Sequence, residues 1–351
     1  MNTFPADVYL EGQDQFRGWF QSSLLNACKD GPISPYKKLI THGFVVDKNN
    51  NKMSKSLGNV IAPQELIDEY GVDTLRIWAL SQSYEGNIRY SKQNMQKADE
   101  MEKRFRNTLR FLLGNIHYLE ENNSSEVIYD ELDFTEKWIL AELYDLEQYV
   151  KNFDQAYDFA QFLQKLYNFC TVELSQFYFD ISKDKLYCDT LEASKTIRLT
   201  MKILFDKLIR WLSIYMPFGA EEAYQTVHTQ SVCLLTYSYD VKHANQDIQN
   251  KMKQLREIRK IIFKEIERKR ELHEIVSYAD ADVVFYTQQD IDESLLQYIC
   301  MIPNLSIQYG KEEKVIVAKS DKHKCIHCRR YVNIQNQTVC SRCKYVETSS
   351  I

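Results

Sequence analysis

The sequence lacks long hydrophobic runs and is poor in glycine and proline. No stretch of about 18 apolar residues occurs, and no basic segment leads into a hydrophobic one at the N-terminus. We therefore predict neither a membrane-spanning helix nor a secretory signal. Ten glycines and six prolines among 351 residues exclude a collagen-like or low-complexity chain. We expect a folded cytoplasmic protein with no membrane partner and, at this length, more than one domain.

The sequence has nine cysteines, an odd number, and five of them are scattered along the chain. This distribution does not fit the disulfide framework of a small secreted protein. Four of them form two Cys-x-x-Cys pairs, Cys325 with Cys328 and Cys340 with Cys343. Two such pairs can place four thiolates around one Zn²⁺ and leave no open position, which predicts a structural metal site. The alternative is a pair of redox dithiols.

Two histidines lie beside these cysteines, but four thiolates already complete a tetrahedral site. We expect His323 and His327 to lie around the site or at the surface.

The net charge of −5 is unevenly distributed. Residues 251–271 carry nine Lys or Arg against four Glu, and residues 319–344 carry seven against one Asp. The remainder of the chain is therefore strongly acidic, which excludes a protein that coats nucleic acid along its whole surface. In the C-terminal segment we expect four residues to contact phosphate: Arg329, Arg330, Arg342 and Lys344. For 251–271 the simpler interpretation is a solvated helix face.

The N-terminal hundred residues have an α/β pattern. We predict strands at 7–10 and 39–46, a helix over 17–28 and a polar turn at 47–51. Pro63 should open another helix that ends at Gly71, and Asp73 should cap the next.

The rest of the chain is mostly helical. Apolar residues recur at helical spacing from about 92 to 230, notably over 156–177 and 199–215, which predicts the core of a helix bundle. A linker at 231–250 should precede a basic helix over 251–274 and strands at 282–286 and 314–318. The predicted fold class is mainly α, with a partial α/β region at the N-terminus and a small α/β module plus a zinc knuckle at the C-terminus.

A basic loop follows the second predicted strand, with the sequence Lys52-Met53-Ser54-Lys55-Ser56. Ammonium groups three residues apart on a loop can follow nucleotide phosphates as charge builds on a leaving pyrophosphate. Judged by charge alone, a solvated surface loop is an equally good interpretation.

This loop resembles the KMSKS motif of class I aminoacyl-tRNA synthetases. Residues 9–24, YLEGQDQFRGWFQSSL, resemble the isoleucine-pocket segment of isoleucyl-tRNA synthetases. Further similarity lies at 41–45, 106–113 and 177–180, and bacterial members also end in a four-cysteine zinc module. The predicted N-terminal α/β region thus resembles the second half of the synthetase nucleotide-binding (Rossmann) fold.

The resemblance implies roles for particular residues. Glu11 is expected to hold the isoleucyl-adenylate, and the same pocket would be lined by four others: Gly12, Asp14, Gln15 and Trp19. Lys55 matches the ATP-binding lysine, and Lys52 shares its loop as a catalytic candidate. Trp19 is equally well interpreted as a core residue. Gln13 and Phe16 depart from the usual Ser and His of the family.

The resemblance also implies four domains. These are the second half of the catalytic domain at 1–95, a helical anticodon-binding domain at 96–245, a small α/β junction module at 246–318 and a zinc module at 319–351. No His-x-Gly-His motif occurs in the sequence. We therefore expect the first half of the ATP site and the editing domain to be absent.

The implied activity is the ATP-dependent ligation of isoleucine to tRNA(Ile), with Mg²⁺ expected beside ATP and one structural Zn²⁺. It would need the missing half: the chain is then either the product of a truncated reading frame or half of a split enzyme whose partner supplies that half. A second hypothesis is a non-catalytic tRNA-binding remnant. A third is an unrelated zinc-ribbon protein with a fortuitous lysine loop. We also expect the half-sheet to expose an edge and an apolar face that seek a partner.

Overall fold

The computed structural model describes residues 4–120, 128–151, 157–236, 244–334 and 338–349. The chain divides into two compact units. One comprises residues 1–107, 152–167 and 209–236, and the other comprises 108–151, 168–208 and 237–351. Two long helices, α4 (Lys92–Glu120) and α9 (Lys195–Tyr215), contribute residues to both.

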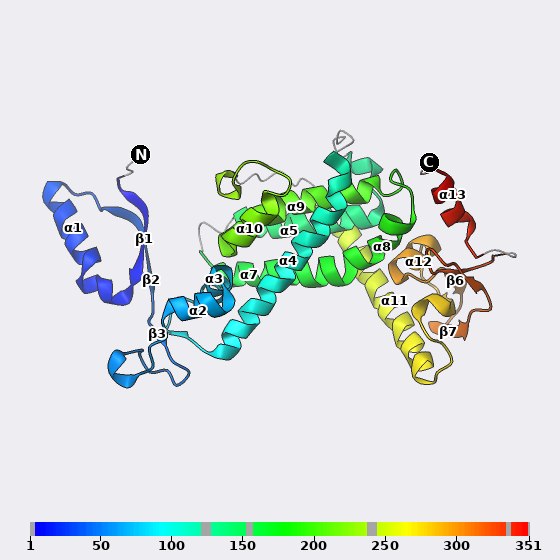
Figure 1. The fold of residues 1–351 in the computed structure, drawn as a ribbon, viewed down its shortest axis with the longest axis horizontal. Coiled ribbons are helices and arrows are strands. Elements are labelled where there is room, and N and C mark those ends of the chain that lie inside the picture. The colour runs from blue at the N-terminus through cyan, green and yellow to red at the C-terminus, as the bar shows by residue number, and fades with distance from the viewer. Residues whose placement is uncertain (1–3, 121–127, 152–156, 237–243, 335–337, 350–351) are drawn as a thin grey trace. The chain divides into compact units, whose positions relative to one another are not determined.

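The first unit begins with a strand, a helix and a parallel strand. β1 (Ala6–Gly12) leads through a 3-10 turn, η1 (Gln13–Arg17), into α1 (Trp19–Asp30), and β2 (Tyr36–His42) then pairs with β1 (Figure 1). This confirms the predicted strand and helix. The prediction of one strand at 39–46 is wrong in one respect, because this segment divides into the end of β2 and a separate strand, β3 (Val45–Val46). β3 pairs in parallel with β4 (Ile88–Arg89).

The break between β2 and β3 falls at Gly43. A Cβ atom there would lie 2.2 Å from the carbonyl oxygen of Gly86, so only glycine allows the two backbones to approach this closely.

The remaining elements of the first unit are short helices: η2 (Lys55–Leu57), α2 (Pro63–Tyr70), α3 (Val72–Leu80), α7 (Phe159–Asn168), α10 (Pro217–Tyr224) and η5 (Val232–Leu234). α2 opens at Pro63 and ends at Gly71, as predicted.

The prediction that Asp73 caps its own helix is wrong. The residue preceding α3 is Gly71, and Asp73 is buried inside the first turn. Its carboxylate accepts hydrogen bonds from the backbone N–H groups of Phe218 (3.3 Å) and Gly219 (2.7 Å), which are otherwise unpaired at the start of α10. Burial raises the pKa of Asp73, and these two hydrogen bonds oppose that rise.

The second unit contains a helix bundle built from η3 (Tyr129–Glu131), α5 (Phe134–Lys151), η4 (Phe169–Tyr178), α8 (Phe179–Cys188) and parts of α4 and α9. Its core includes Trp138, Phe177 and Tyr178, each at most 2% exposed. The stripe predicted at 156–177 is helical from Phe159 onward, and residue 156 lies outside the described residues. Its second half, η4, is a π-helix that the periodicity did not indicate.

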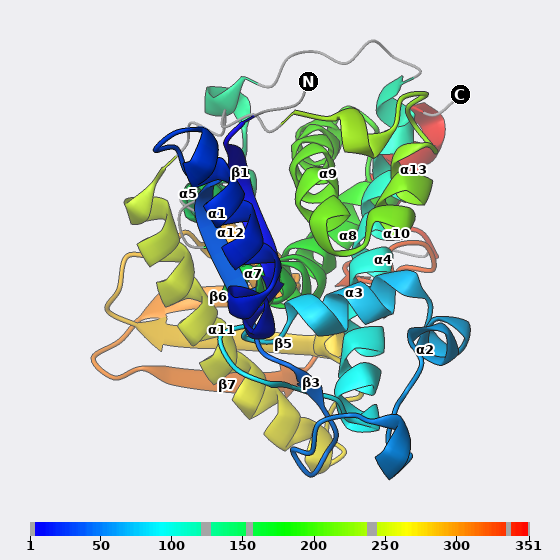
Figure 2. The ribbon, with the colours of Figure 1, turned by 90° about the vertical axis from the view of Figure 1, so that its left-hand side faces the viewer.

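A small α/β module follows the bundle. It comprises α11 (Gln246–Glu271), η6 (Tyr278–Asp280), β5 (Ala281–Thr287), α12 (Glu293–Cys300), β6 (Asn304–Tyr309) and β7 (Lys314–Lys319). The strand order is β6-β5-β7, with β6 parallel and β7 antiparallel to β5. α11 packs on β7 (Figure 2), α12 packs on β6, and the two helices contact each other. The sequence analysis predicted β5, β7 and the basic helix but missed α12 and β6. The linker predicted at 231–250 is wrong at its end, because α11 already begins at Gln246, and its residues 237–243 lie outside the described residues.

A buried arginine ties the bundle helices together. Arg198 on α9 donates to the carbonyl oxygens of Asn115 (2.9 Å) and Leu186 (3.1 Å) and to Oγ of Ser194 (3.1 Å). Burial lowers the pKa of this guanidinium. Both carbonyl groups lose a hydrogen-bond donor if the side chain is shortened or made apolar.

We expect Arg198→Met to lower the free energy of unfolding by about 3 kcal/mol, because the substitution leaves buried acceptors unsatisfied. Urea unfolding of the whole chain measures this. Lys195→Met on the same helix is the control and should change the stability by less than about 0.5 kcal/mol. Equal effects of the two substitutions would contradict this account of Arg198.

Candidate functional site

The carboxyl ends of β1 and β2 lie side by side, since Glu11 pairs with Thr41 and Gly12 with His42. This edge of a parallel sheet is where ligands bind in open α/β folds. Oε2 of Glu11 accepts a hydrogen bond from the N–H of Gly12 (2.7 Å) and lies 4.0 Å from Nε2 of His42. The Glu11 carboxylate is exposed and can accept further hydrogen bonds. The sequence analysis did not single out His42 as a neighbour of Glu11.

The other predicted pocket residues surround the start of α1. Oε1 of Gln15 accepts from the N–H of Trp19 (3.0 Å), and Oδ2 of Asp14 accepts from Nε2 of Gln15 (3.3 Å). The Trp19 ring stacks on Tyr9 with a centroid distance of 4.3 Å and lines a cavity of about 610 Å³. Tyr9 and Glu11 are two residues apart on one strand and so face the same side of the sheet. Trp19 is 45% exposed, and its ring is thus not a fully buried core group.

The lysine loop is closed by two polar side chains. Oδ1 of Asp47 accepts from the N–H groups of Asn49 and Asn51, each at 2.9 Å, and Oδ2 accepts from Nδ2 of Asn59 at 3.0 Å. Oδ1 of Asn59 in turn accepts from the N–H of Ser54 (2.9 Å). These hydrogen bonds, that from Asn59 first, lower the pKa of Asp47. Asp47 belongs to the predicted turn, whereas nothing local in the sequence indicates the role of Asn59.

The two lysines of the loop have different surroundings. Nζ of Lys52 lies 4.2 Å from the centroid of the Phe44 ring, a cation–π contact. Lys55 is exposed at the start of η2, and no carboxylate of the described residues pairs with it. Its ammonium group is therefore available to an anionic ligand.

The four C-terminal thiols form a cluster. The Sγ atoms of Cys325, Cys328, Cys340 and Cys343 all lie within 4.8 Å of one another, and three of these residues are buried. The cluster joins the hairpin of β8 (His323–Lys324) and β9 (Tyr331–Val332) to α13 (Ser341–Ser349). Burial raises the pKa of Cys325, but hydrogen bonds from nearby backbone N–H groups outweigh it and lower that pKa to about 6. This group of thiols could hold a metal ion.

One nearby histidine contacts a side chain of its own module. Nε2 of His327 lies 3.2 Å from the Glu347 carboxylate on α13.

The zinc-module arginines were expected to contact phosphate, but two of them are already paired. Both terminal nitrogens of Arg342 donate to the Asp184 carboxylate on α8, at 2.6 and 2.9 Å. Nη2 of Arg330 donates to the same carboxylate at 2.7 Å. Arg342 and Arg330 thus attach the cysteine cluster to α8. The hydrogen bond with Asp184 also raises the pKa of Arg342.

Two segments of the chain match known protein families. Residues 1–91 match the family of tRNA synthetases class I (I, L, M and V). Residues 136–285 match the anticodon-binding domain of tRNA ligases. Isoleucine–tRNA ligase from Pelagibacter ubique (strain HTCC1062) is 34% identical over 354 residues, covering 97% of this chain and 38% of that protein. This chain belongs to the class I aminoacyl-tRNA synthetases.

Other members of this synthetase family show the same coverage. Isoleucine–tRNA ligase from Caldicellulosiruptor bescii is 35% identical over 99% of this chain and 40% of its own length. The protein from Bartonella henselae is 36% identical over 88% of this chain and 32% of its own length. The chain thus spans about two fifths or less of the length of these curated relatives.

A solved structure shares the fold of this chain. The LeuRS–tRNA–LeuAMS ternary complex of Agrobacterium radiobacter K84 matches with a TM-score of 0.54 at 16% identity, over 90% of this chain and 32% of that one. The predicted fold class, mainly α with a partial α/β region, is confirmed. Among the described residues, no helix is both long and apolar enough to cross a bilayer.

We expect Asp184→Asn to loosen the attachment of the cysteine cluster to α8, because it removes the charge that two arginines share. Hydrogen exchange of the backbone of residues 338–349 should speed up by at least tenfold. Asp180→Asn, which breaks a surface pair with Lys183 on the same helix, is the control and should leave that exchange unchanged. Unchanged exchange in Asp184→Asn would show that the ion pair does not hold the module.

Proposed function

We propose that this chain is the C-terminal portion of an isoleucine–tRNA ligase, which activates isoleucine with ATP and transfers it to tRNA(Ile). The observation that carries this proposal is the similarity to isoleucine–tRNA ligases along 97% of the chain. The exposed Glu11 carboxylate at the strand edge supports it, as does the Lys55 ammonium, which pairs with no carboxylate in the part of the chain that the structure describes. A role in translation is also the basis for proposing a cytoplasmic location.

In this proposal the strand edge holds the adenylate. Glu11 accepts hydrogen bonds from the ammonium or ribose hydroxyl groups of isoleucyl-adenylate, next to Gly12. Asp14 and Gln15 stabilise the η1 turn, which follows Glu11 and Gly12, through their side-chain hydrogen bonds. Trp19 supplies an apolar wall for the branched side chain, and its stacking on Tyr9 fixes the orientation of the ring.

The lysine loop acts on ATP. Lys55 binds the phosphates and offsets the charge that builds on the departing pyrophosphate, as preorganised cations do in phosphoryl chemistry. Lys52 approaches the same phosphates only if its contact with Phe44 is released. Mg²⁺ accompanies ATP, as expected for a nucleotide substrate.

The remaining segments bind tRNA and stabilise the structure. We propose a division into the catalytic half at 1–95, the anticodon-binding bundle at 96–245, the junction module at 246–318 and the zinc module at 319–351. The family match at 136–285 supports tRNA binding by the middle of the chain.

The four cysteines would bind one Zn²⁺ with no open coordination position, so the ion is structural. A low pKa at Cys325 favours the thiolate that a metal requires, whereas burial raises the pKa of Cys328 and of Cys343, which a bound cation would have to offset. The cluster is also most of the module's own core, which otherwise contains Ile334, Val332 and Val339.

We propose that activity requires the part of the relatives that this chain does not match. That part would belong to the same polypeptide or to a separate N-terminal half. The surface of the β1–α1–β2 segment is suited to such a partner, since Leu10 on β1 and Leu25 on α1 are 58% and 63% exposed. The alternative function is a tRNA-binding remnant without catalysis. The basic residues of α11 favour it as a second candidate.

We expect the zinc-loaded chain to charge tRNA(Ile) with radiolabelled isoleucine only when an N-terminal half with the HIGH-type motif is added. In that mixture Lys55→Ala should lower the rate by about 10²- to 10³-fold. Lys48→Ala, in the turn just before the lysine loop, is the control and should have little effect on the rate of charging.

Each other outcome of this assay has a definite meaning. Charging by the chain alone would overturn the need for a second half. No charging in either case, with tRNA binding retained, would favour the binding remnant.

We expect the purified chain to contain one Zn²⁺ and Cys343→Ser to lose it, since three thiolates hold the ion less tightly than four. Elemental analysis measures the metal. Hydrogen exchange should increase in residues 319–349 but not in the bundle, which has its own core. Cys233→Ser, at an exposed cysteine, is the control. A zinc-free chain, or loss of zinc from both variants, would contradict the site.

A further inference from the structure

One side chain, that of Asn59, attaches the lysine loop to the strand that precedes it. Its amide makes three hydrogen bonds. Oδ1 accepts from the N–H of Ser54 (2.9 Å), and Nδ2 donates to Oδ2 of Asp47 (3.0 Å) and, over a longer distance, to the carbonyl oxygen of Lys52 (3.4 Å). Asn59 thus binds the loop at two points, and the second of these is adjacent to Lys55.

The carboxylate that Asn59 binds is itself held in place. Asp47 directly follows β3, which pairs with β4. Its Oδ1 accepts from the N–H groups of Asn49 and Asn51, so the carboxylate is already oriented where it meets Asn59. Hydrogen bonds to an ionised acceptor are stronger than those between neutral groups. The Asp47–Asn59 contact therefore joins the loop firmly to a paired strand.

The turn that carries Lys55 depends on Ser54. The N–H of Leu57 donates to both Oγ (3.3 Å) and the carbonyl oxygen (3.2 Å) of Ser54. Gly58 ends the turn with a φ of 64° and donates its N–H to the carbonyl oxygen of Lys55 (3.2 Å). Lys55 is the first residue of this turn, η2. The position of Ser54 therefore sets that of the Lys55 backbone.

Little else holds this part of the chain. None of the three residues of η2 is buried, so the burial of apolar side chains does not fix its position. The isolated bridge between Val46 and Lys52 fixes only the start of the loop. The conformation of the loop beyond Lys52 thus depends on polar contacts, and the contact through Asn59 leads back to the sheet.

We propose that Asp47 and Asn59 are positioning residues for the activation of isoleucine. Through Ser54 they hold the loop where the Lys55 ammonium meets the phosphates of ATP, so this inference rests on the ATP-binding role proposed for Lys55. A cation that is already in place needs no reorganisation as charge builds on the leaving pyrophosphate. Loss of the contact should therefore destabilise the transition state more than bound ATP.

A matched pair of substitutions, Asn59→Ala and Asn51→Ala, tests this role. Nδ2 of Asn51 also donates to Oδ2 of Asp47 (3.4 Å), but among the described residues its side chain has no hydrogen bond with the lysine loop. The assay is isoleucine-dependent ATP–pyrophosphate exchange by the whole chain mixed with an N-terminal half. We expect Asn59→Ala to lower kcat about tenfold and to change KM for ATP less than about twofold. Asn51→Ala should change neither by more than about twofold.

Exchanging the two side chains tests the contact itself. Asn59→Asp alone brings two carboxylates together, and Asp47→Asn alone brings two amide groups together, so each should lower kcat. In the double variant the amide at position 47 donates to the carboxylate at position 59. The second oxygen of that carboxylate still accepts from the N–H of Ser54. We expect the double variant to recover kcat to within about threefold of the wild type.

Hydrogen exchange of residues 52–58 in the whole chain, without the second half, reports on the loop independently of activity. It should speed up at least about fivefold in Asn59→Ala and return toward the wild-type rate in the double variant. Faster exchange with an unchanged kcat, or a higher KM at constant kcat, would overturn the positioning role. So would a double variant that restores the protection of the loop but not kcat.

The wild-type mixture separates this inference from the function on which it rests. If that mixture is active and Asn59→Ala is equally active, the positioning role is wrong and the ligase function stands. If the wild-type mixture has no exchange activity, both are wrong.

Discussion

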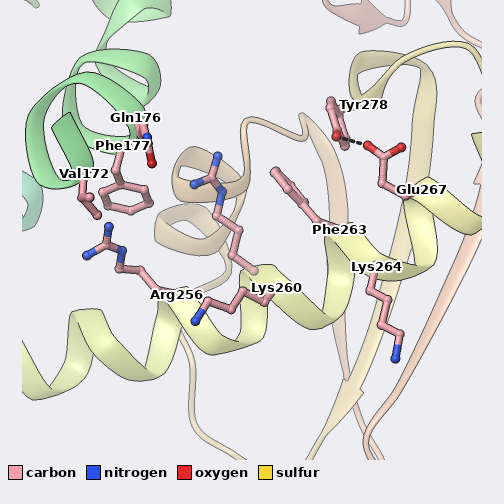
Figure 3. A pocket seen from close by; sticks show the side chains of 10 residues that line it. Val172, Gln176, Phe177, Arg256, Lys260, Phe263, Lys264, Glu267 and Tyr278 are labelled. Atoms are coloured by element: carbon pink, nitrogen blue, oxygen red, sulfur yellow. Dashed lines mark hydrogen bonds between the residues drawn. The ribbon is translucent and has the colours of Figure 1, made fainter. Parts of the chain in front are cut away.

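The burial of one apolar stripe on α11 determines the arrangement of the second unit. Met252, Leu255, Ile258, Ile262 and Ile266 are all at most 3% exposed. Through this helix the small sheet and the bundle share a packing element, because α11 contacts α5 as well as β7 and α12. The stripe also fixes which residues face the other way. Because these apolar side chains are buried, the arginines and lysines of α11 lie on the other side of the helix. Four of them line a cavity against η4 (Figure 3): Arg256, Arg259, Lys260 and Lys264.

In the first unit the comparable constraint is the parallel register of β1 and β2. It brings the end of the first strand beside the end of the second, so Glu11 and His42 meet although 31 positions separate them. The lysine loop follows directly and is closed by Asp47 and Asn59. The ligand groups of this unit thus lie on short connections that start from a paired strand, a common arrangement in which a rigid element positions a polar loop.

Several features could be predicted from the sequence because their causes are local. Helical periodicity at 159–177 and 199–215, Pro63 and Gly71 at the ends of α2, and the paired Cys-x-x-Cys spacings all act within a few residues. The fold class followed from these patterns. The short motifs around Glu11 and Lys55 pointed to the family, and the comparisons established it. The roles of those residues remain predictions.

Other features depend on partners far away in the sequence and could not be predicted. Asp73 looked like a cap for its own helix, yet its carboxylate binds α10, about 145 positions later. Arg330 and Arg342 looked available to phosphate, but Asp184 on α8 accepts from both. β6 and α12 were missed because their short apolar runs have no clear period.

The sequence by itself determined the helical bundle, the strand–helix–strand start, the four cysteines that cluster and the family, since periodicity, spacing and motif identity are local properties. Only the tertiary structure decided which charges remain unpaired. Among the described residues, Lys55 and Arg259 have no carboxylate within ion-pair distance, whereas Arg256, Arg330 and Arg342 each have one. The reason is that a cationic side chain is available to an anionic ligand only when no carboxylate packs beside it. Contacts between residues far apart in the sequence decide where each carboxylate lies.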